Sequence, residues 1–235
     1  MLSLIILQAS QNLTQGVQAI GKVVQPGAGK MGFIEMVLKG GPVMIPIVLL
    51  SIIAVYIFFD RYMAIRKAGK VDARLMNRVR EYIVGGKIDQ AFALCRNENT
   101  PTSRMIEKGI SRMGRSMSDV TMAIENVGNV EISKLEKGLP ILASVAGGAP
   151  MLGFLGTVTG MIEIFYDMAN AGSNINITLL SSGIYQAMIT TVAGLIVGIA
   201  AYFAYNILVS KVGNVVYKME YATNEFMDML YESAK

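Results

Sequence analysis

The sequence contains no histidine and no tryptophan, and Cys95 is its only cysteine. Without histidine a chain cannot build a Ser-His-Asp or Cys-His nucleophile, nor a metal site with imidazole ligands. A single cysteine forms neither an intrachain disulfide nor a thiolate cluster for a metal ion. We therefore expect a protein that is not an enzyme and binds no metal, with Cys95 filling space in a small helical core.

Cofactor and nucleic-acid signals are also weak. Gly27-Ala28-Gly29-Lys30-Met31-Gly32 has the form GxGxxG, but it follows no predicted strand, which a dinucleotide site requires. No Walker A sequence is present, so ATP is not bound in that way. The basic residues are scattered among acidic ones instead of forming a patch. We expect no cofactor and no nucleic acid.

Charge is scarce, at 16% of residues against 53% hydrophobic ones, and its distribution is uneven. Two stretches, 138–162 and 168–210, contain no charged residue at all. About 20 apolar residues cross the hydrocarbon core of a bilayer, so each stretch is long enough to span it. The short polar break from Asn170 to Thr178 lets the two spans return antiparallel. The sequence therefore predicts a transmembrane hairpin.

Another uncharged run, residues 40–59, ends at Asp60 and Arg61 and predicts a first span. Between Arg61 and Gly138 there are 15 basic residues against 9 acidic ones, whereas the break at 170–178 holds no charge. Because positive residues stay on the cytoplasmic side, the N-terminus is predicted outside and the C-terminus inside. The fold class predicted is an all-α membrane protein with three transmembrane helices and a cytoplasmic helical bundle.

We divide the chain into five parts on this basis, with the spans near 42–63, 139–169 and 178–209. Apolar spacing and capping residues predict four cytoplasmic helices: 72–84, 87–96, a third capped by Thr100, and a fourth capped by Ser118. A last helix continues the third span and packs on these four. The parts are a periplasmic or interfacial segment 1–39, with a surface helix at Met31–Lys39, span 40–65, a cytoplasmic region 66–138, the hairpin 139–209 and a cytoplasmic helix 210–235.

Small residues recur at intervals of three and four along both arms of the hairpin. The first arm also carries Gly147 and Gly148. Lipid provides no hydrophobic force to bring helices together, so close backbone approach over small residues has to provide it. The spacing therefore predicts dense helix packing through Gly153, Gly156, Gly160, Gly194 and Gly198.

Polar side chains lie among these small residues, which is costly in a membrane unless they face protein or water. Counted from a loop midpoint near Asn174, Thr157 and Thr191 are each 17 residues away, so they are predicted at one depth near the membrane centre. A threonine can also bond the carbonyl four residues back in its own helix. Both a structural role and a hydrated ion path remain open for Thr157, Thr159, Gln186, Thr190 and Thr191.

The motif Gly148-Ala149-Pro150, followed by Gly156-Thr157-Val158, resembles the second membrane helix of the ExbB/TolQ/MotA family of ion-driven motor subunits. The stretch AMITTVAGL at 187–195 resembles the third helix. The resemblance implies that Thr157 and Thr191 take the places of the family's threonines on the second and third helices. Thr190 adds a hydroxyl at the same depth, and we include it in the predicted pathway. ExbB and TolQ proteins typically carry Glu at the position of Gln186, so a proton-relay role is not inherited there.

Glu163 lies about as deep as Gln186, at 11 and 12 residues from the loop midpoint. Two interpretations are open: Glu163 reaches water on the outer side, or it replaces the carboxylate missing at position 186. Its position about 120° round the helix from Thr157 weakens the second interpretation. Asp167 is expected near the outer interface, where it needs only water.

The resemblance implies a bacterial inner-membrane subunit that assembles as a pentamer around a dimer of ExbD/TolR-like single-span partners, whose membrane Asp carries the ion. Three spans favour the ExbB and TolQ branch over flagellar stators. The sequence does not separate ExbB, which works with a TonB-like protein, from TolQ, and of the two we favour ExbB. A structural membrane scaffold and a small transporter remain alternatives, although no internal repeat supports a transporter. The family default favours the proton as the ion, whereas Thr190-Thr191 and the missing Glu favour sodium.

Overall fold

The computed structural model describes residues 40–69, 74–170 and 177–233. The surface helix expected at 31–39, the GxGxxG motif, the helix start expected at Asp72 and the loop midpoint near Asn174 lie outside these residues. Within them the chain is all α-helical and no strand occurs. The helices are α3 (Met44–Ala68), α4 (Leu75–Val84), α5 (Ile88–Glu98), α6 (Pro101–Ile110), α7 (Met117–Glu136), α8 (Leu139–Asn170) and α9 (Ile177–Ser233).

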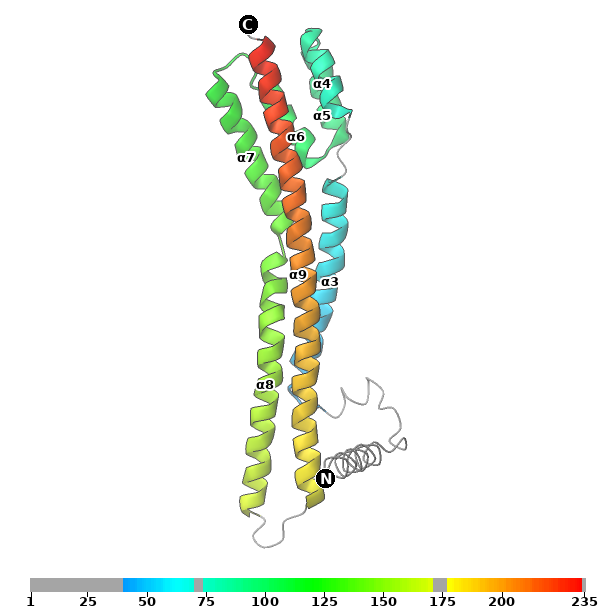
Figure 1. Cartoon of the computed structure of the whole chain (residues 1–235), viewed down its shortest axis with the longest axis vertical. Coiled ribbons are helices and arrows are strands. Elements are labelled where there is room, and N and C mark those ends of the chain that lie inside the picture. The colour runs from blue at the N-terminus through cyan, green and yellow to red at the C-terminus, as the bar shows by residue number, and fades with distance from the viewer. Residues whose placement is uncertain (1–39, 70–73, 171–176, 234–235) are drawn as a thin grey trace, which may run out of the picture.

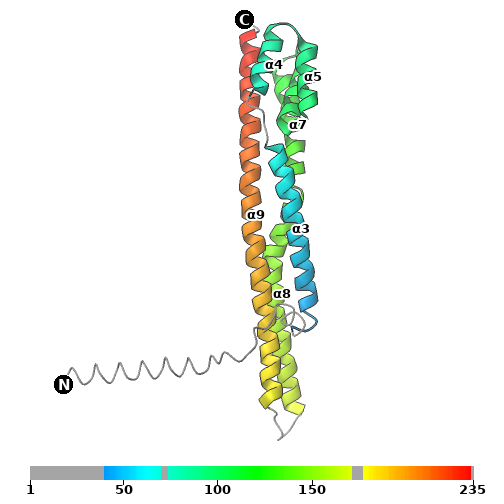
Figure 2. The same cartoon turned by 90° about the vertical axis from the view of Figure 1, so that its right-hand side faces the viewer.

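Three of these helices, α3, α8 and α9, are long and apolar and lie side by side (Figures 1 and 2). Each contains a window apolar enough to cross a membrane. Helix α9 runs for 57 residues without interruption, which corresponds to about 85 Å at 1.5 Å per residue. The predicted fold class is confirmed in its helices and in the number of candidate spans. The expected continuation of the third span into a C-terminal helix is confirmed as well.

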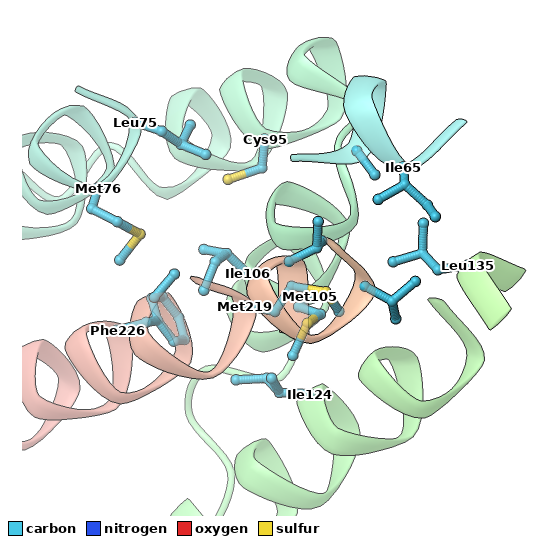
Figure 3. Close-up of a cluster of buried hydrophobic side chains, with 14 of the residues drawn as sticks. Ile65, Leu75, Met76, Cys95, Met105, Ile106, Ile124, Leu135, Met219 and Phe226 are labelled. Atoms are coloured by element: carbon cyan, nitrogen blue, oxygen red, sulfur yellow. The ribbon is translucent and has the colours of Figure 1, made fainter. Parts of the chain in front are cut away.

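A bundle of α4, α5, α6 and α7 lies along the C-terminal half of α9, at the end away from the hairpin connection (Figures 1 and 2). Figure 3 shows its core, to which Ile65 of α3, Leu75 of α4, Ile106 of α6 and Phe226 of α9 contribute. Cys95 of α5 is fully buried in this core. The space-filling role expected of Cys95, and the packing of the last helix on the shorter ones, are therefore confirmed.

The helix caps agree with the sequence at one position and differ at another. Thr100 caps α6 as expected. Its side chain accepts a hydrogen bond from the Ser103 amide, the Ser103 hydroxyl accepts one from the Thr100 amide, and Pro101 occupies the first turn. The cap of α7 is Ser116, and the prediction of Ser118 was wrong. Ser116 has an extended backbone (ψ 145) and its Oγ accepts from Asp119 N at 3.2 Å, whereas Ser118 is already helical.

Helix α3 begins at Met44, four residues after the start of the predicted uncharged run, because Gly41 adopts φ +70 and Pro42 follows it. Met44 and Ile47 pack on Ile189 and Ala193 of α9. At the opposite end of α3, Arg61 Nη1 donates to Lys134 O at 3.2 Å. These contacts fix α3 along α9 and place its first residues beside the middle of the hairpin.

Candidate ion pathway

The pathway residues are built on the seam between α8 and α9, where two backbones meet. A Cβ on Gly194 would lie 2.9 Å from the Cα of Gly153, and a Cβ on Gly153 would lie 2.8 Å from Thr190 O. Both distances are shorter than real Cβ atoms allow, so only glycine fits at either position. The close approach brings backbone carbonyls and side-chain hydroxyls of the two helices within hydrogen-bond reach.

The remaining small residues extend the seam in both directions. Gly156 faces the Thr190 side chain, Gly160 faces Ala187, and Gly198 lies against the ring of Pro150 within α8. Gly147 and Gly148 meet nothing within 4 Å. Within a single subunit these two glycines therefore do not pack on α9, and their packing against another helix stays a prediction.

Three threonine hydroxyls converge on one backbone carbonyl, that of Gly153. Thr191 Oγ1 donates to Gly153 O at 3.0 Å from across the seam, and Thr157 Oγ1 lies 3.2 Å from the same oxygen. Thr190 Oγ1 lies 3.4 Å from it and 2.7 Å from Ala187 O. The hydroxyls of Thr157 and Thr191 also hydrogen-bond each other, so the two residues lie at the same level of the hairpin.

Each hydroxyl carries a single proton but can also accept hydrogen bonds. Thr157 and Thr191 each have two acceptors in reach, the Gly153 carbonyl and the partner hydroxyl. Either hydroxyl can therefore donate to the other, and the direction of the bond reverses when the protons exchange acceptors. The bonding to backbone carbonyls is the structural role left open by the sequence. A hydroxyl pair whose hydrogen bond can reverse is suited to a proton wire, and the lone pairs of its oxygens are suited to a cation.

A cavity of about 470 Å³ lies beside this cluster, toward the hairpin connection. Helix α8 contributes Thr159 and Glu163, α9 contributes Gln186 and Thr190, and the residues before α3 contribute Pro42. Thr157 and Thr191 do not line it. The structure thus joins Gln186, Thr190 and Glu163 around one space and joins Thr190 to the hydroxyl cluster.

Asp167 also lines the cavity, and the sequence argument assigned it no role there. The sequence could have predicted this, because Thr159, Glu163 and Asp167 are spaced by four residues and therefore share one face of a helix. Glu163 does lie about 120° round α8 from Thr157, and this direction turns it toward the cavity that Gln186 also lines.

The sequence profile of the MotA/TolQ/ExbB proton channel family matches residues 97–221, which is more than half of the chain. The chain belongs to this family. The match includes α6, α7, α8 and most of α9, and therefore the hydroxyl cluster and the α8 and α9 walls of the cavity. Members of the family are channel or motor subunits embedded in a membrane, and the three apolar helices agree with that.

Individual relatives carry ExbB and TolQ names. An ExbB homolog for biopolymer transport from Methanothermobacter thermautotrophicus is 29% identical over 80% of this chain and 66% of its own length. The ExbB-like 1 biopolymer transport protein of Synechocystis sp. is 30% identical over 74% of this chain and 69% of its own. The Tol-Pal system protein TolQ of Haemophilus influenzae is 34% identical over 45% and 46%. The chain spans about two thirds of the first two relatives and about half of the third.

Glu131 of α7, which precedes the apolar helix α8, is the one charged side chain that is buried among the described residues, at 3% exposure. Its carboxylate accepts hydrogen bonds from Arg104 of α6 at 2.5 Å and from Lys134 at 2.7 Å. Burial alone would raise the pKa of Glu131, but the two cationic donors outweigh it and hold the pKa below its usual value. The Arg104 pair joins α6 to α7, and the Lys134 pair lies within α7, near the end that leads into α8.

Proposed function

We propose that this chain is the multi-pass inner-membrane subunit of an ion-driven motor, coupling the proton motive force to mechanical work on the cell envelope. The relatives named ExbB, which align over most of the chain, support a role in energising TonB-dependent import through the outer membrane. The observation that carries the proposal is the hydroxyl cluster at the α8–α9 seam, because it provides oxygen ligands within otherwise apolar helices.

The proposed roles follow from this geometry. Thr157 and Thr191 form the reversible hydroxyl pair through which protons or hydrated ions pass. Thr190 connects that pair to the cavity, and Gln186 offers a neutral amide there. Gly153, Gly156, Gly160, Gly194 and Gly198 hold the two helices close enough for the hydroxyls to meet.

Assembly into a pentamer around a dimer of ExbD/TolR-like single-span partners is part of the proposal. Helix α8 leaves large apolar side chains exposed on the side away from α9, including Met151 at 74% and Phe154 at 66%. Such a face needs lipid or neighbouring helices in a membrane. Ion flow between the ring and the partner's membrane Asp, expected from the family resemblance, would then turn one against the other.

A TolQ-like role in maintaining the outer membrane is the second candidate. It is supported by the TolQ protein of Haemophilus influenzae, which is 34% identical over 45% of this chain. The two roles use the same motor chemistry and differ in the protein that receives the work.

Copurification of the native complex, followed by mass spectrometry, tests the proposal and separates the two roles. We expect a single-span partner in every preparation. A TonB-like protein, with loss of TonB-dependent uptake when the gene is deleted, identifies the ExbB role. A Tol-Pal protein, with a leaking outer membrane, identifies the TolQ role. A complex containing only this chain, with no phenotype that depends on the proton motive force, would leave a structural scaffold.

A further inference from the structure

We infer that the cavity lined by Glu163, Asp167 and Gln186 is a cation-binding site that supplies the hydroxyl cluster, and that Glu163 provides its principal ligand. The inference rests on the proposed function and adds to it a specific acid and an entry point. The ligand chemistry is that of a small hard monovalent cation, either a proton held by the carboxylate or Na⁺.

The cavity lies next to the hydroxyl cluster, on the side of the hairpin connection. In Figure 2 the α8–α9 pair continues past the start of α3 toward the hairpin connection. The cavity lies at this step, bounded by the residues that precede α3 on one side and by the hairpin on the other. Thr190, at 2% exposure, is its innermost polar residue and lies 3.4 Å from the Gly153 carbonyl of the cluster. A cation in the cavity is therefore one side chain away from the Thr157–Thr191 pair.

The charge of the cavity is negative among the residues described. Glu163 and Asp167 both line the cavity, and no Lys or Arg among the described residues lines it. Residues 138 to 210 contain no basic residue at all, so the hairpin itself provides no basic side chain to neutralise the carboxylates. Two carboxylates against apolar helices raise the local cation concentration. Within a membrane such groups hold a proton, bind a cation or find a counter-charge.

The polar side chains that line the cavity are suited to binding a hard cation. Carboxylate, amide and hydroxyl oxygens are the donors that hard cations prefer, and the described lining of the cavity offers these with no thiolate or imidazole, its one sulfur being the Met168 thioether. Glu163 is closer along α8 than Asp167 to Thr159, and both Glu163 and Gln186 face the same space from opposite helices. A carboxylate at either of these two positions would therefore serve one site.

The turn before α3 completes the wall. Gly41 has φ +70, which favours glycine, and a Cβ at that position would overlap the amide nitrogen of Gln186. The Gln186 side chain therefore passes close to this turn, and it is exposed in the single chain. This places the amide at the edge of the cavity, where it adds a neutral oxygen to the site.

Carbodiimide labelling of the purified native complex tests the site directly, without requiring a working motor. Dicyclohexylcarbodiimide adds to protonated carboxyl groups in apolar surroundings, and mass spectrometry then locates the adduct. We expect the adduct on Glu163 and its loss in Glu163→Gln. Labelling slowed by Na⁺ at constant pH assigns the site to Na⁺, and labelling indifferent to Na⁺ assigns it to the proton. Absence of the adduct from Glu163 in the wild-type complex would overturn the inference.

Lys39, the nearest basic residue in the sequence, precedes Gly40 and lies outside the described residues. A Glu163 that is ion-paired with Lys39 would stay unlabelled in the wild type and become labelled in Lys39→Gln. That result would replace the cation site by an internal ion pair, and so would contradict the inference.

Flux through proteoliposomes containing the complex provides the second test. Glu163→Gln should lower potential-driven flux at least tenfold with assembly intact, and Asp167→Asn should lower it less. The double variant Glu163→Gln/Gln186→Glu should recover most of the flux, because both positions open into one cavity. Wild-type flux in Glu163→Gln, or a double variant as inactive as the single one, would overturn the role of Glu163. A wild-type complex that conducts nothing refutes the proposed function and leaves the cation site to the labelling result.

Discussion

Thr157 of α8 and Thr191 of α9 hydrogen-bond each other through their hydroxyl groups, and both lie within reach of the same carbonyl, Gly153 O. The contact requires the two helix backbones to approach almost to van der Waals distance, which glycines at positions 153 and 194 allow. The small-residue seam and the polar cluster are thus one feature. Any change that separates the helices also separates the hydroxyls.

Replacing a seam glycine by a larger residue should therefore disrupt the packing of α8 on α9, and with it the assembly of the complex. In Gly194→Ala the new methyl group would collide with the Ala149 carbonyl and with Gly153, an overpacking cost of about 1–3 kcal/mol. Gly156→Leu and Gly194→Leu should prevent assembly altogether. Native-gel analysis of the membrane complex measures this. Gly213→Ala is the matched control on the same helix, because nothing lies within 4 Å of its Cβ position. Intact complexes from both leucine variants would contradict the packing argument.

Cys95 should be chemically silent in the folded protein. Burial, with a smaller contribution from the carboxylates of Glu107 and Glu98, raises the pKa of its thiol to about 12. Only the thiolate reacts at a useful rate, so a maleimide should leave Cys95 unmodified at neutral pH and modify it after denaturation. Mass spectrometry gives the result. Rapid labelling of the native protein would show that the α4–α6 core opens in solution.

A silent native cysteine makes topology mapping simple, because introduced cysteines can be read without first removing Cys95. Asn129 in α7 and Asn170 at the end of α8 are both exposed. With the N-terminus outside, an impermeant maleimide should label Asn170→Cys in intact cells and Asn129→Cys only after the inner membrane is opened. The reverse pattern would invert the predicted orientation.

The buried Glu131 should stabilise the bundle of α6 and α7 in a pH-dependent way. Because its pKa is lowered on folding, the stabilisation is present above the pKa of an unfolded glutamate, about 4.3. It is lost as the pH falls through the lower folded value. Glu131→Gln should cost about 2 kcal/mol near neutral pH, since it removes hydrogen bonds to charged groups.

Thermal unfolding of the two proteins in detergent, from neutral to acidic pH, tests this. The difference in melting temperature between wild type and Glu131→Gln should shrink as the pH falls. A difference that stays constant with pH would mean that Arg104 and Lys134 do not interact with an ionised carboxylate.

Much of this architecture could be predicted from the sequence because membrane helices are governed by simple constraints. The length of the uncharged runs gave the three long helices, and equal counting from the hairpin connection gave the Thr157–Thr191 pairing. The cap of α7 was misplaced because Ser116 and Ser118 are both acceptable caps and only the backbone distinguishes them. Gly147 and Gly148 recur with the other small residues of α8 yet meet nothing within 4 Å, because spacing alone does not show which side of α8 faces α9.

The cavity could not be predicted, because its third wall comes from the residues before α3. That wall depends on Met44 and Ile47 packing on α9, a tertiary contact that leaves no periodic signal. Without it Glu163 and Asp167 are two acids near an interface, and with it they share a space with Gln186. The closeness of Glu163 to Gln186 in depth was visible in the sequence, but the space between them was not.

The central claim is that the hydroxyl pair at the α8–α9 seam carries ions, and Thr157→Val tests it most directly. Valine matches the shape of threonine but removes the oxygen that reaches Thr191 and Gly153. Ser144→Ala is the matched control, since it removes a hydroxyl that bonds only its own helix at Pro140 O. The measurement is potential-driven flux in proteoliposomes containing the assembled complex, with and without sodium.

We expect Thr157→Val to assemble normally and to lose flux, and Ser144→Ala to retain both. With the proton as the ion, wild-type flux persists in sodium-free medium at constant membrane potential, and its collapse there would assign sodium instead. Flux at the wild-type level in Thr157→Val would contradict the account, because the pair would then serve only to hold the two helices together.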